Sequence, residues 1–163
     1  MDNLWAPWRA KYIEKAVKNE DSSCIFCTFP AASEDQKNLI LFRGQYNFVI
    51  LNAFPYNAGH LMVVPFRHTS ALEELPEEER NEHYRLVCRA VAILKNEYKP
   101  EGFNIGMNLG RVGGAGIDKH IHTHIVPRWN GDTNFMPVIG QTKVQNEAPA
   151  DTYRRLKPCF QSV

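Results

Sequence analysis

The sequence predicts an α+β protein in which an antiparallel sheet of about five strands packs against one long helix. Three observations lead to this prediction. Short apolar segments next to turn residues recur along the chain, and a single long segment between residues 70 and 98 has helical spacing. The regular alternation of strands and helices that a doubly wound parallel sheet requires is absent from the sequence.

The expected strands are short apolar segments next to turn residues. Residues 39–51 contain two apolar runs around Arg43-Gly44-Gln45, which is the pattern of a β-hairpin. Three further strands are expected at residues 60–65, 103–108 and 120–126. Only one long helix separates these segments, so antiparallel pairing is favoured.

The expected helix follows an acidic opening at residues 72–79. After it, apolar residues recur at helical spacing, namely Tyr84, Val87, Cys88, Val91 and Leu94. Negative charge stabilises the first turn of a helix, so we expect the glutamates of this opening to be solvated there. His83 lies among polar residues and is expected at the surface.

Two segments flank the expected core. Residues 1–23 mix aromatic side chains with charge, which predicts a shorter helical arm that packs on the body of the protein. Apolar residues make up 44% of the 163 residues, enough to bury one core, so we expect a single domain over residues 1–163. Within it, residues 24–130 are expected to form the core and residues 131–163 a C-terminal extension.

The overall charge and hydropathy exclude several classes of protein. The 19 basic and 18 acidic residues leave a net charge of +1, so there is no broad positive field for polymeric nucleic acid. No apolar run approaches the roughly 20 residues that span a bilayer, and the N-terminus lacks the pattern of a secretory leader. We therefore expect a cytoplasmic protein that has no membrane partner and binds any anionic ligand locally.

Three histidines alternate in the strand expected at residues 120–126. Successive side chains of a strand point to opposite faces, so His120, His122 and His124 are expected on one face, with α-carbons about 6.6 Å apart. Two interpretations remain open at this point. Three neutral imidazoles converge on a zinc ion, or a central imidazole attacks phosphorus as a nucleophile.

A glycine-rich loop precedes the histidines. Gly113, Gly114 and Gly116 lie in residues 110–116, and their backbone amides can form a concave site for an anion. Such a loop alone is weak evidence, and it has neither the Walker lysine pattern nor the dinucleotide-binding fingerprint. Its position directly before the histidines favours a phosphate ligand.

Residues 120–126, His-Ile-His-Thr-His-Ile-Val, resemble the signature of the histidine triad family of nucleotidyl hydrolases and transferases. Residues 52–65 resemble the family's first catalytic segment, and Asn108 matches a family position that contacts phosphate. Residues 4–9 and 127–135 are similar to the bacterial branch that includes diadenosine tetraphosphate phosphorylases. The resemblance implies a histidine triad fold and a dinucleoside polyphosphate substrate.

The resemblance also implies a role for each matching histidine. His122 would attack the α-phosphorus and carry the nucleotidyl group, which divides one difficult step into two easier ones. Water or inorganic phosphate would then release the nucleotide. His124 would hold oxygens of the phosphate or the leaving group, and His60 would complete the cluster from a neighbouring strand.

Other matching residues would bind the substrate. Asn52 would lie near the nucleotide sugar, while Asn108 and backbone amides of the loop would stabilise charge on the non-bridging oxygens. The loop residues implied are Gly114, Gly116 and Ile117. Many relatives carry a Gln-Ser pair before the triad, where this chain has Gly116-Ile117-Asp118-Lys119, so a hydroxyl contact is missing. Lys119 is expected at the surface.

Cys24 and Cys27 form a Cys-x-x-Cys pair, which supplies half of a tetrahedral zinc site. A redox pair and two unligated thiols are the alternatives. The resemblance to zinc-containing bacterial members implies that His68 and His120 complete a structural Cys2His2 zinc site. His120 would then be removed from catalysis.

The predicted function is cleavage of a dinucleoside polyphosphate through a nucleotidyl-His122 intermediate, by phosphorolysis or hydrolysis, with diadenosine tetraphosphate favoured. Hydrolysis of adenosine phosphoramidates or aminoacyl adenylates is an alternative that uses the same first step. A catalytically silent nucleotide-binding module and a three-histidine metal hydrolase are further alternatives. The resemblance also implies a homodimer, in which the region of Trp129 and Phe135 reaches the partner's site.

Overall fold

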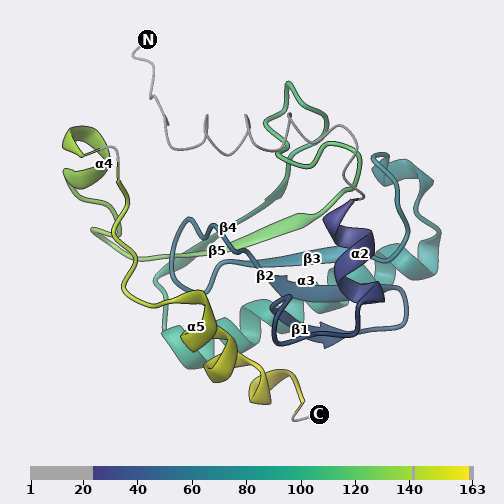
Figure 1. Ribbon diagram of the computed structural model, residues 1–163, viewed down its shortest axis with the longest axis horizontal. Coiled ribbons are helices and arrows are strands. Elements are labelled where there is room, and N and C mark those ends of the chain that lie inside the picture. Colours follow the sequence, from purple (N-terminus) through teal and green to yellow (C-terminus); the bar gives the residue numbers. More distant parts are fainter. Residues whose placement is uncertain (1–23, 141, 162–163) are drawn as a thin grey trace.

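The computed structural model describes residues 24–140 and 142–161 (Figure 1). The elements follow in the order α2 (Ile25–Ala31), β1 (Ile40–Arg43), β2 (Asn47–Leu51), β3 (Leu61–Pro65), the 3-10 helix η1 (Leu72–Glu74), α3 (Glu77–Tyr98), β4 (Gly102–Met107), β5 (Thr123–Arg128), α4 (Met136–Ile139), α5 (Pro149–Leu156) and the 3-10 helix η2 (Pro158–Phe160). The arm predicted at residues 1–23 lies outside the described residues.

The five strands form one sheet in the order β1-β2-β3-β5-β4, and every neighbouring pair is antiparallel. Among the described residues, α3 is the one long helix, and the short helix α2 lies at the N-terminal end. The predicted α+β class, with an antiparallel sheet and a long helix, is therefore confirmed. The order also sets β3 beside β5, so the two segments that carry the candidate histidines are neighbours.

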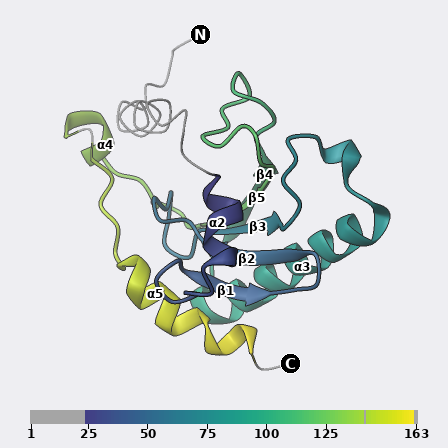
Figure 2. The ribbon, with the colours of Figure 1, turned by 45° about the vertical axis from the view of Figure 1, so that its right-hand side comes forward.

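Helices cover both faces of the sheet (Figure 2). On one face, α3 and α5 pack against Val49, Leu51, Leu61, Val63 and Ile125. On the other face, Phe26 of α2 packs in a cluster with Ile40, Phe48, Ile50, Met62 and Val64. Burial on both faces explains why β2 and β3 are continuous apolar runs rather than alternating ones. His124 pairs with Met62 and so lies on the α2 face.

The last strand differs from its predicted bounds at both ends. β5 begins at Thr123 rather than at residue 120, and the Ile121 amide donates to the Thr69 carbonyl at 2.8 Å instead of joining a strand ladder. β3 pairs with β5 only as far as Ile125, so Pro127 faces no strand on that side. Its missing N–H therefore costs no ladder hydrogen bond, and β5 continues to Arg128.

Helix α3 buries a face that coincides only in part with the predicted one, since Val87 and Leu94 are buried as predicted. Its buried apolar residues are Leu86, Val87, Ala90 and Leu94. The prediction was wrong for Tyr84, which is 70% exposed, and for Cys88, which is also exposed. The predicted and the observed sets of residues both have helical spacing. The observed buried face includes the polar residue His83, so an apolar pattern does not identify it.

His83 and Glu79 are buried, so the predictions of a surface histidine and a fully solvated first turn were wrong for these residues. His83 is 6% exposed, with Nδ1 2.8 Å from Asn47 Oδ1 and Nε2 2.7 Å from Thr123 Oγ1. Glu79 pairs with Arg67 at 2.6 Å. Polar partners satisfy both side chains, which is what permits their burial. The two glutamates before Glu79 are exposed, as predicted.

The segment after β5 returns to the core. Tyr153, Leu156 and Phe160 join the apolar cluster of α3, and Arg89 of α3 donates to the Phe160 carbonyl at 2.7 Å. These contacts fasten the C-terminal helices α5 and η2 to the sheet. None of the helices in the described part of the chain combines the length and apolarity needed to cross a membrane.

Candidate functional site

Three histidines gather on the α2 face of the sheet, but they are not the three of the alternating motif. His60 lies directly before β3, and its Nε2 is 3.0 Å from Nδ1 of His124 in β5. The ring centroids of His122 and His124 are 4.8 Å apart. His120 instead points toward Cys24, because the chain is not yet in the strand at this residue. The histidine cluster therefore consists of His60, His122 and His124.

Hydrogen bonds assign the protons of His60 and His124. The backbone N–H of Tyr56 donates to His60 Nδ1 at 3.0 Å, so a neutral His60 carries its proton on Nε2. That proton is donated to His124 Nδ1 at 3.0 Å. A neutral His124 consequently carries its own proton on Nε2, where it can be donated to an oxygen of a ligand.

His122 has the opposite proton arrangement. Its Nδ1 lies 2.9 Å from the carbonyl oxygen of His120, so Nδ1–H donates and the lone pair remains on Nε2. The residue is 5% exposed, and the ring of Phe26 packs on it at a centroid distance of 5.0 Å. A fixed, neutral imidazole with a bare Nε2 is the form that can act as a nucleophile.

Burial keeps His60 and His122 of this cluster neutral. Desolvation, followed by the charges of His124 and His122, lowers the pKa of His60 from 6.5 to about 3. Burial also lowers the pKa of His122, and the hydrogen bond to the His120 carbonyl opposes this effect in part. Both rings are therefore neutral at neutral pH, as the proton assignments require.

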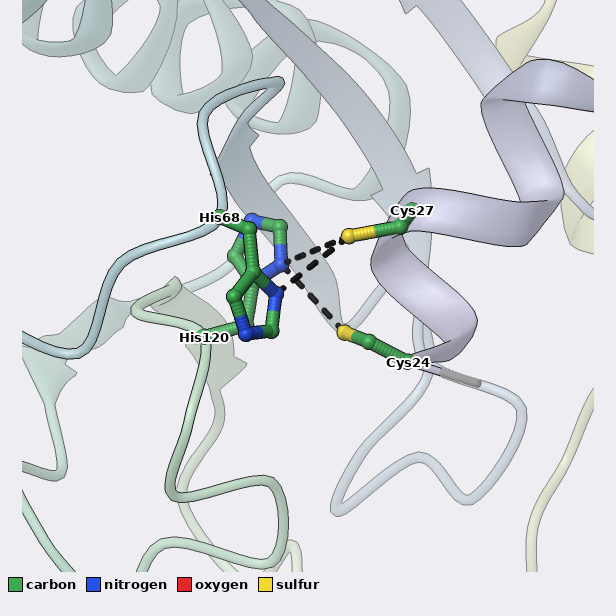
Figure 3. Close-up of side chains that lie close together, drawn as sticks. All are labelled: Cys24, Cys27, His68 and His120. Carbon is green, nitrogen blue, oxygen red and sulfur yellow. Dashed lines mark hydrogen bonds between the residues drawn. The ribbon is translucent and has the colours of Figure 1, made fainter. Parts of the chain in front are cut away.

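A second cluster, of two cysteines and two histidines, lies at the start of α2 (Figure 3). Cys24 precedes the helix, Cys27 lies in its first turn, His68 follows β3 and His120 precedes β5. The Nδ1 atom of His120 is 3.3 Å from Cys24 Sγ and 3.7 Å from Cys27 Sγ. The Nδ1 atom of His68 is 3.3 Å from Cys27 Sγ. The four ligand atoms all lie within 4.8 Å of one another.

The donors of this second cluster fit a zinc ion. Two sulfurs and two imidazole nitrogens are the ligands that tetrahedral zinc prefers. His120 Nε2–H donates to the Pro65 carbonyl at 2.8 Å, which leaves the Nδ1 lone pair directed at the cysteines. Burial and the neighbouring Cys24 raise the pKa of the Cys27 thiol, and a divalent cation would reverse this by stabilising the thiolates. These residues form a candidate Cys2His2 metal site.

The three histidines of the motif do not converge on one metal. His120 belongs to the Cys2His2 group, whereas His122 and His124 are not part of it and their rings lie together in the histidine cluster. In residues 24–140 and 142–161, no other group of histidine, cysteine and acidic side chains lies close enough to hold an ion. The three-histidine metal hydrolase considered from the sequence therefore lacks its ligand set.

The predicted substrate-binding asparagines border the histidine cluster. Asn52 follows β2, and its Nδ2 is 3.4 Å from His60 Nδ1. Its Oδ1 accepts the Phe54 amide at 2.9 Å. Asn108 follows β4 and donates to the Gly114 carbonyl at 3.3 Å, which ties the end of β4 to the glycine loop.

The glycine loop is partly closed on itself. The Gly114 amide donates to the Arg111 carbonyl at 3.0 Å, so it is already engaged in a turn. Within the described residues, no backbone carbonyl accepts the amides of Gly116 or Ile117. Those two amides therefore remain candidates for binding a ligand. Lys119 is exposed, as predicted.

Sequence reasoning misses two aromatic residues of the site. Phe26 packs on the ring of His120 at 5.5 Å as well as on His122. Tyr56 packs on His60 at 4.5 Å and on His124 at 5.7 Å. Their only signals in the sequence are the place of Phe26 inside the Cys-x-x-Cys pair and the place of Tyr56 inside residues 52–65, which resemble the family's first catalytic segment.

A buried polar network supports β5 from the α3 face. Asn47 donates to the Glu79 carbonyl at 3.0 Å, so its Oδ1 accepts Nδ1–H of His83. His83 Nε2 then accepts the hydroxyl hydrogen of Thr123, the first residue of β5, which lies between His122 and His124. Burial lowers the pKa of His83 to about 4, which keeps the ring neutral.

Known proteins resemble this chain in sequence. A model of the HIT domain matches residues 33–131. AP-4-A phosphorylase of Mycobacterium tuberculosis is 41% identical over 162 residues, which cover 96% of this chain and 83% of that protein. An uncharacterized HIT-like protein of Methanocaldococcus jannaschii is 34% identical over 109 residues, which cover 67% of this chain and 81% of that protein.

Solved structures share the fold. A Zn-bound histidine triad family protein from Mycobacterium smegmatis matches with a TM-score of 0.68 at 24% sequence identity, over 85% of this chain and 94% of that one. The domain model spans more than half of the chain, and a relative that is 41% identical matches nearly all of it. The chain therefore belongs to the histidine triad (HIT) family.

Proposed function

We propose that this protein cleaves a dinucleoside polyphosphate, favouring diadenosine tetraphosphate, through a covalent nucleotidyl group on His122. The observation that carries the proposal is the bare Nε2 of His122, held by the 2.9 Å bond from Nδ1 to a carbonyl and placed beside the ring of His124. The AP-4-A phosphorylase of Mycobacterium tuberculosis, 41% identical to this chain, supports the substrate class.

In the first step, His122 Nε2 attacks the α-phosphorus, and the bond from that phosphorus to the leaving oxygen breaks. The leaving group departs as a nucleoside polyphosphate anion. The His122 ring becomes positively charged, and the His120 carbonyl that accepts Nδ1–H stabilises this charge. His124 donates a hydrogen bond from Nε2 to a phosphate oxygen. His60 acts through His124 as a positioning residue, because it fixes the His124 proton.

In the second step, an acceptor oxygen attacks the phosphorus of the nucleotidyl-His122. The phosphorus–nitrogen bond breaks, and the lone pair returns to Nε2. Inorganic phosphate as acceptor converts diadenosine tetraphosphate to ADP and ATP, whereas water gives AMP and ATP and releases a proton to the solvent. Dividing the reaction into two displacements lowers the barrier of each.

The residues around the α-phosphate supply hydrogen-bond donors. We assign Asn108 and the amides of Gly116 and Ile117 to the non-bridging oxygens, where negative charge develops. Gly114 contributes through its carbonyl, which holds the Asn108 side chain at 3.3 Å. Asn52, on the far side of His60, is assigned to the nucleotide sugar.

We also propose that Cys24, Cys27, His68 and His120 hold a zinc ion. When bound, the ion would cross-link α2, the loop after β3 and the segment before β5. Four protein ligands leave no open position for water, so the role is structural. His120 then serves the reaction only through its carbonyl, as a positioning residue for His122.

We further propose a cytoplasmic homodimer joined at the outer edge of β4. This edge pairs with no other strand in the described residues, and Ile105 on it is 49% exposed. An unpaired edge that carries apolar side chains can add a strand from another chain. Phe135, 66% exposed, is then available to the partner's site along with the neighbouring Trp129. Light scattering after size exclusion should give the mass of a dimer, and the mass of a monomer would contradict the proposed homodimer.

The four free cysteines are consistent with the reducing environment of the cytoplasm.

Product analysis tests the proposed reaction. The protein is incubated with diadenosine tetraphosphate, with and without inorganic phosphate, and the nucleotides are separated by anion-exchange chromatography. Phosphate-dependent ADP and ATP establish phosphorolysis, whereas AMP and ATP without phosphate establish hydrolysis. His122→Ala should abolish either reaction. Cleavage of an adenosine phosphoramidate alone supports the alternative substrate class, and no His122-dependent cleavage of either substrate leaves a nucleotide-binding module.

A further inference from the structure

A pocket of about 520 Å³ opens beside the histidine cluster. One wall is formed by alternate residues of β5, His124, Val126 and Arg128, and Asn104 of β4 lies on the neighbouring wall. The residues from 120 to 128 connect the two sites, because His120 belongs to the Cys2His2 cluster and Arg128 lines the pocket. The histidine cluster thus has the metal site on one side and this pocket on the other.

The pocket has an excess of positive charge. Its charged lining residues are Arg128, Lys143 and Asp132, two cations against one carboxylate. Arg128 pairs with the Asp132 carboxylate through two hydrogen bonds, of 2.5 and 3.0 Å. Lys143 makes no ion pair with any carboxylate of the described residues. The uncompensated charge of the pocket is therefore that of Lys143.

A neutral side chain holds Lys143 in place. Its Nζ donates to Oδ1 of Asn57, a residue that is 6% exposed. Asn57 Nδ2 in turn donates to Asp132 Oδ2 at 2.8 Å. The neighbouring residue Tyr56 packs on His124, which places this network next to the histidine cluster. An amide orients the lysine without cancelling its charge.

We propose that this pocket is a second phosphate subsite, in which Lys143 binds a phosphate group other than the one that His122 attacks. The inference rests on the proposed function and names a binding group for it. The phosphate comes either from the distal part of the leaving group or from the inorganic acceptor. Both are multiply charged oxyanions, and an oriented ammonium group binds either of them.

The surroundings of Lys143 favour an oxyanion. Burial lowers the pKa of the Lys143 ammonium group, and the negative charge of Asp132 opposes this effect in part. A bound phosphate would compensate for the hydration that the ammonium group loses on burial. Asn104 Oδ1 accepts from Arg128 at 2.6 Å, so the Asn104 amide hydrogens are left to donate. Asn108, assigned above to the α-phosphate, also lines the pocket and connects the two subsites.

The experiment compares Lys143→Ala and Lys143→Arg with the wild-type protein and with Lys95→Ala. Lys95 is exposed on α3, so its substitution removes the same charge away from the pocket. Isothermal titration calorimetry with inorganic phosphate alone measures binding without turnover. Steady-state kinetics then give KM for phosphate and for diadenosine tetraphosphate, and thermal unfolding verifies that each variant folds.

A charge-assisted hydrogen bond contributes roughly ten- to a hundredfold in affinity. We expect Lys143→Ala to weaken phosphate binding about tenfold or more, and Lys143→Arg to retain most of it. A matching rise in KM for phosphate assigns the subsite to the acceptor. A rise in KM for the dinucleotide alone assigns it to the leaving group. The proposal is overturned if calorimetry and both KM values stay within about twofold of the Lys95→Ala protein.

The subsite and the proposed reaction can be refuted independently of each other. If the wild-type protein shows no His122-dependent cleavage, the proposed reaction fails whatever the pocket binds. The calorimetric comparison still applies in that case, because it needs no reaction. Equal phosphate affinity in wild-type and Lys143→Ala proteins would then overturn the subsite as well.

Discussion

Replacing His83 by alanine tests the buried network beneath the histidine cluster. His83 bonds to Asn47 at 2.8 Å and to Thr123 at 2.7 Å. Asn47 and Thr123 are 0% and 5% exposed, so the substitution leaves two buried polar groups without this partner. Each such group costs about 1–3 kcal/mol. We therefore expect the free energy of unfolding to fall by about 2–6 kcal/mol.

Two further variants isolate the contribution of the network. Thr123→Val removes one of the two hydrogen bonds, so it should cost about half as much as His83→Ala. Tyr84→Ala changes the adjacent residue of α3, which is 70% exposed, and should change the free energy of unfolding by no more than about 0.5 kcal/mol. Urea titrations followed by circular dichroism at pH 7 measure all three variants.

The opposite order of effects would refute this reasoning. A larger loss for Tyr84→Ala than for His83→Ala would mean that α3 buries the stripe predicted from its periodicity. A loss below about 0.5 kcal/mol for His83→Ala would mean that the two hydrogen bonds contribute nothing net to stability. In either case the hydrogen bond between His83 and Thr123 would not stabilise β5.

Two further predictions concern the metal and the pH. Cys24→Ser should reduce the zinc content measured by mass spectrometry of metals and lower Tm, whereas Cys88→Ser, an exposed thiol, should do neither; equal zinc in both variants would contradict the Cys2His2 site. Between pH 7 and pH 5 the free energy of unfolding should fall by about 2 kcal/mol on account of His83, because its pKa of about 4 in the folded protein lies below the ordinary 6.5 and the unfolded chain takes up the proton first. Urea titrations at the two pH values should show a smaller decrease for His83→Gln, and an unchanged decrease would speak against the lowered pKa.

Local sequence patterns predict most of the fold. Apolar runs and turn residues locate the strands of the sheet, including the hairpin of β1 and β2. The start of β5 is missed because a long-range contact, from the Ile121 amide to the Thr69 carbonyl, replaces the strand ladder there. The buried face of α3 is predicted only in part, with Val87 and Leu94 buried but Tyr84 and Cys88 exposed, because two overlapping stripes have the same spacing. The packing of Leu86 and Ala90 in the core and the contacts of His83 with Asn47 and Thr123 select one of them.

The sequence likewise identifies some residues of the candidate site, whereas others can be found only in the folded structure. The histidine motif and the Cys-x-x-Cys pair are visible in the sequence, and the family resemblance indicates His68 and His120 as companions of the cysteines, which the structure brings together. The contact between Asn57 and Lys143 joins residues 86 positions apart. Periodicity and motif spacing carry no information about such a contact, so the charge of the pocket follows only from the folded arrangement.

Trapping the nucleotidyl group on His122 tests the central claim most directly. The protein is mixed with diadenosine tetraphosphate in the absence of phosphate, quenched within one turnover, digested and examined by mass spectrometry for the peptide that contains residues 120–128. We predict a nucleotidyl group on His122 in the wild-type protein and no modified peptide with His122→Ala. Cleavage of the substrate by the His122→Ala variant at the wild-type rate, or a nucleotidyl group on another residue, would contradict the proposed mechanism.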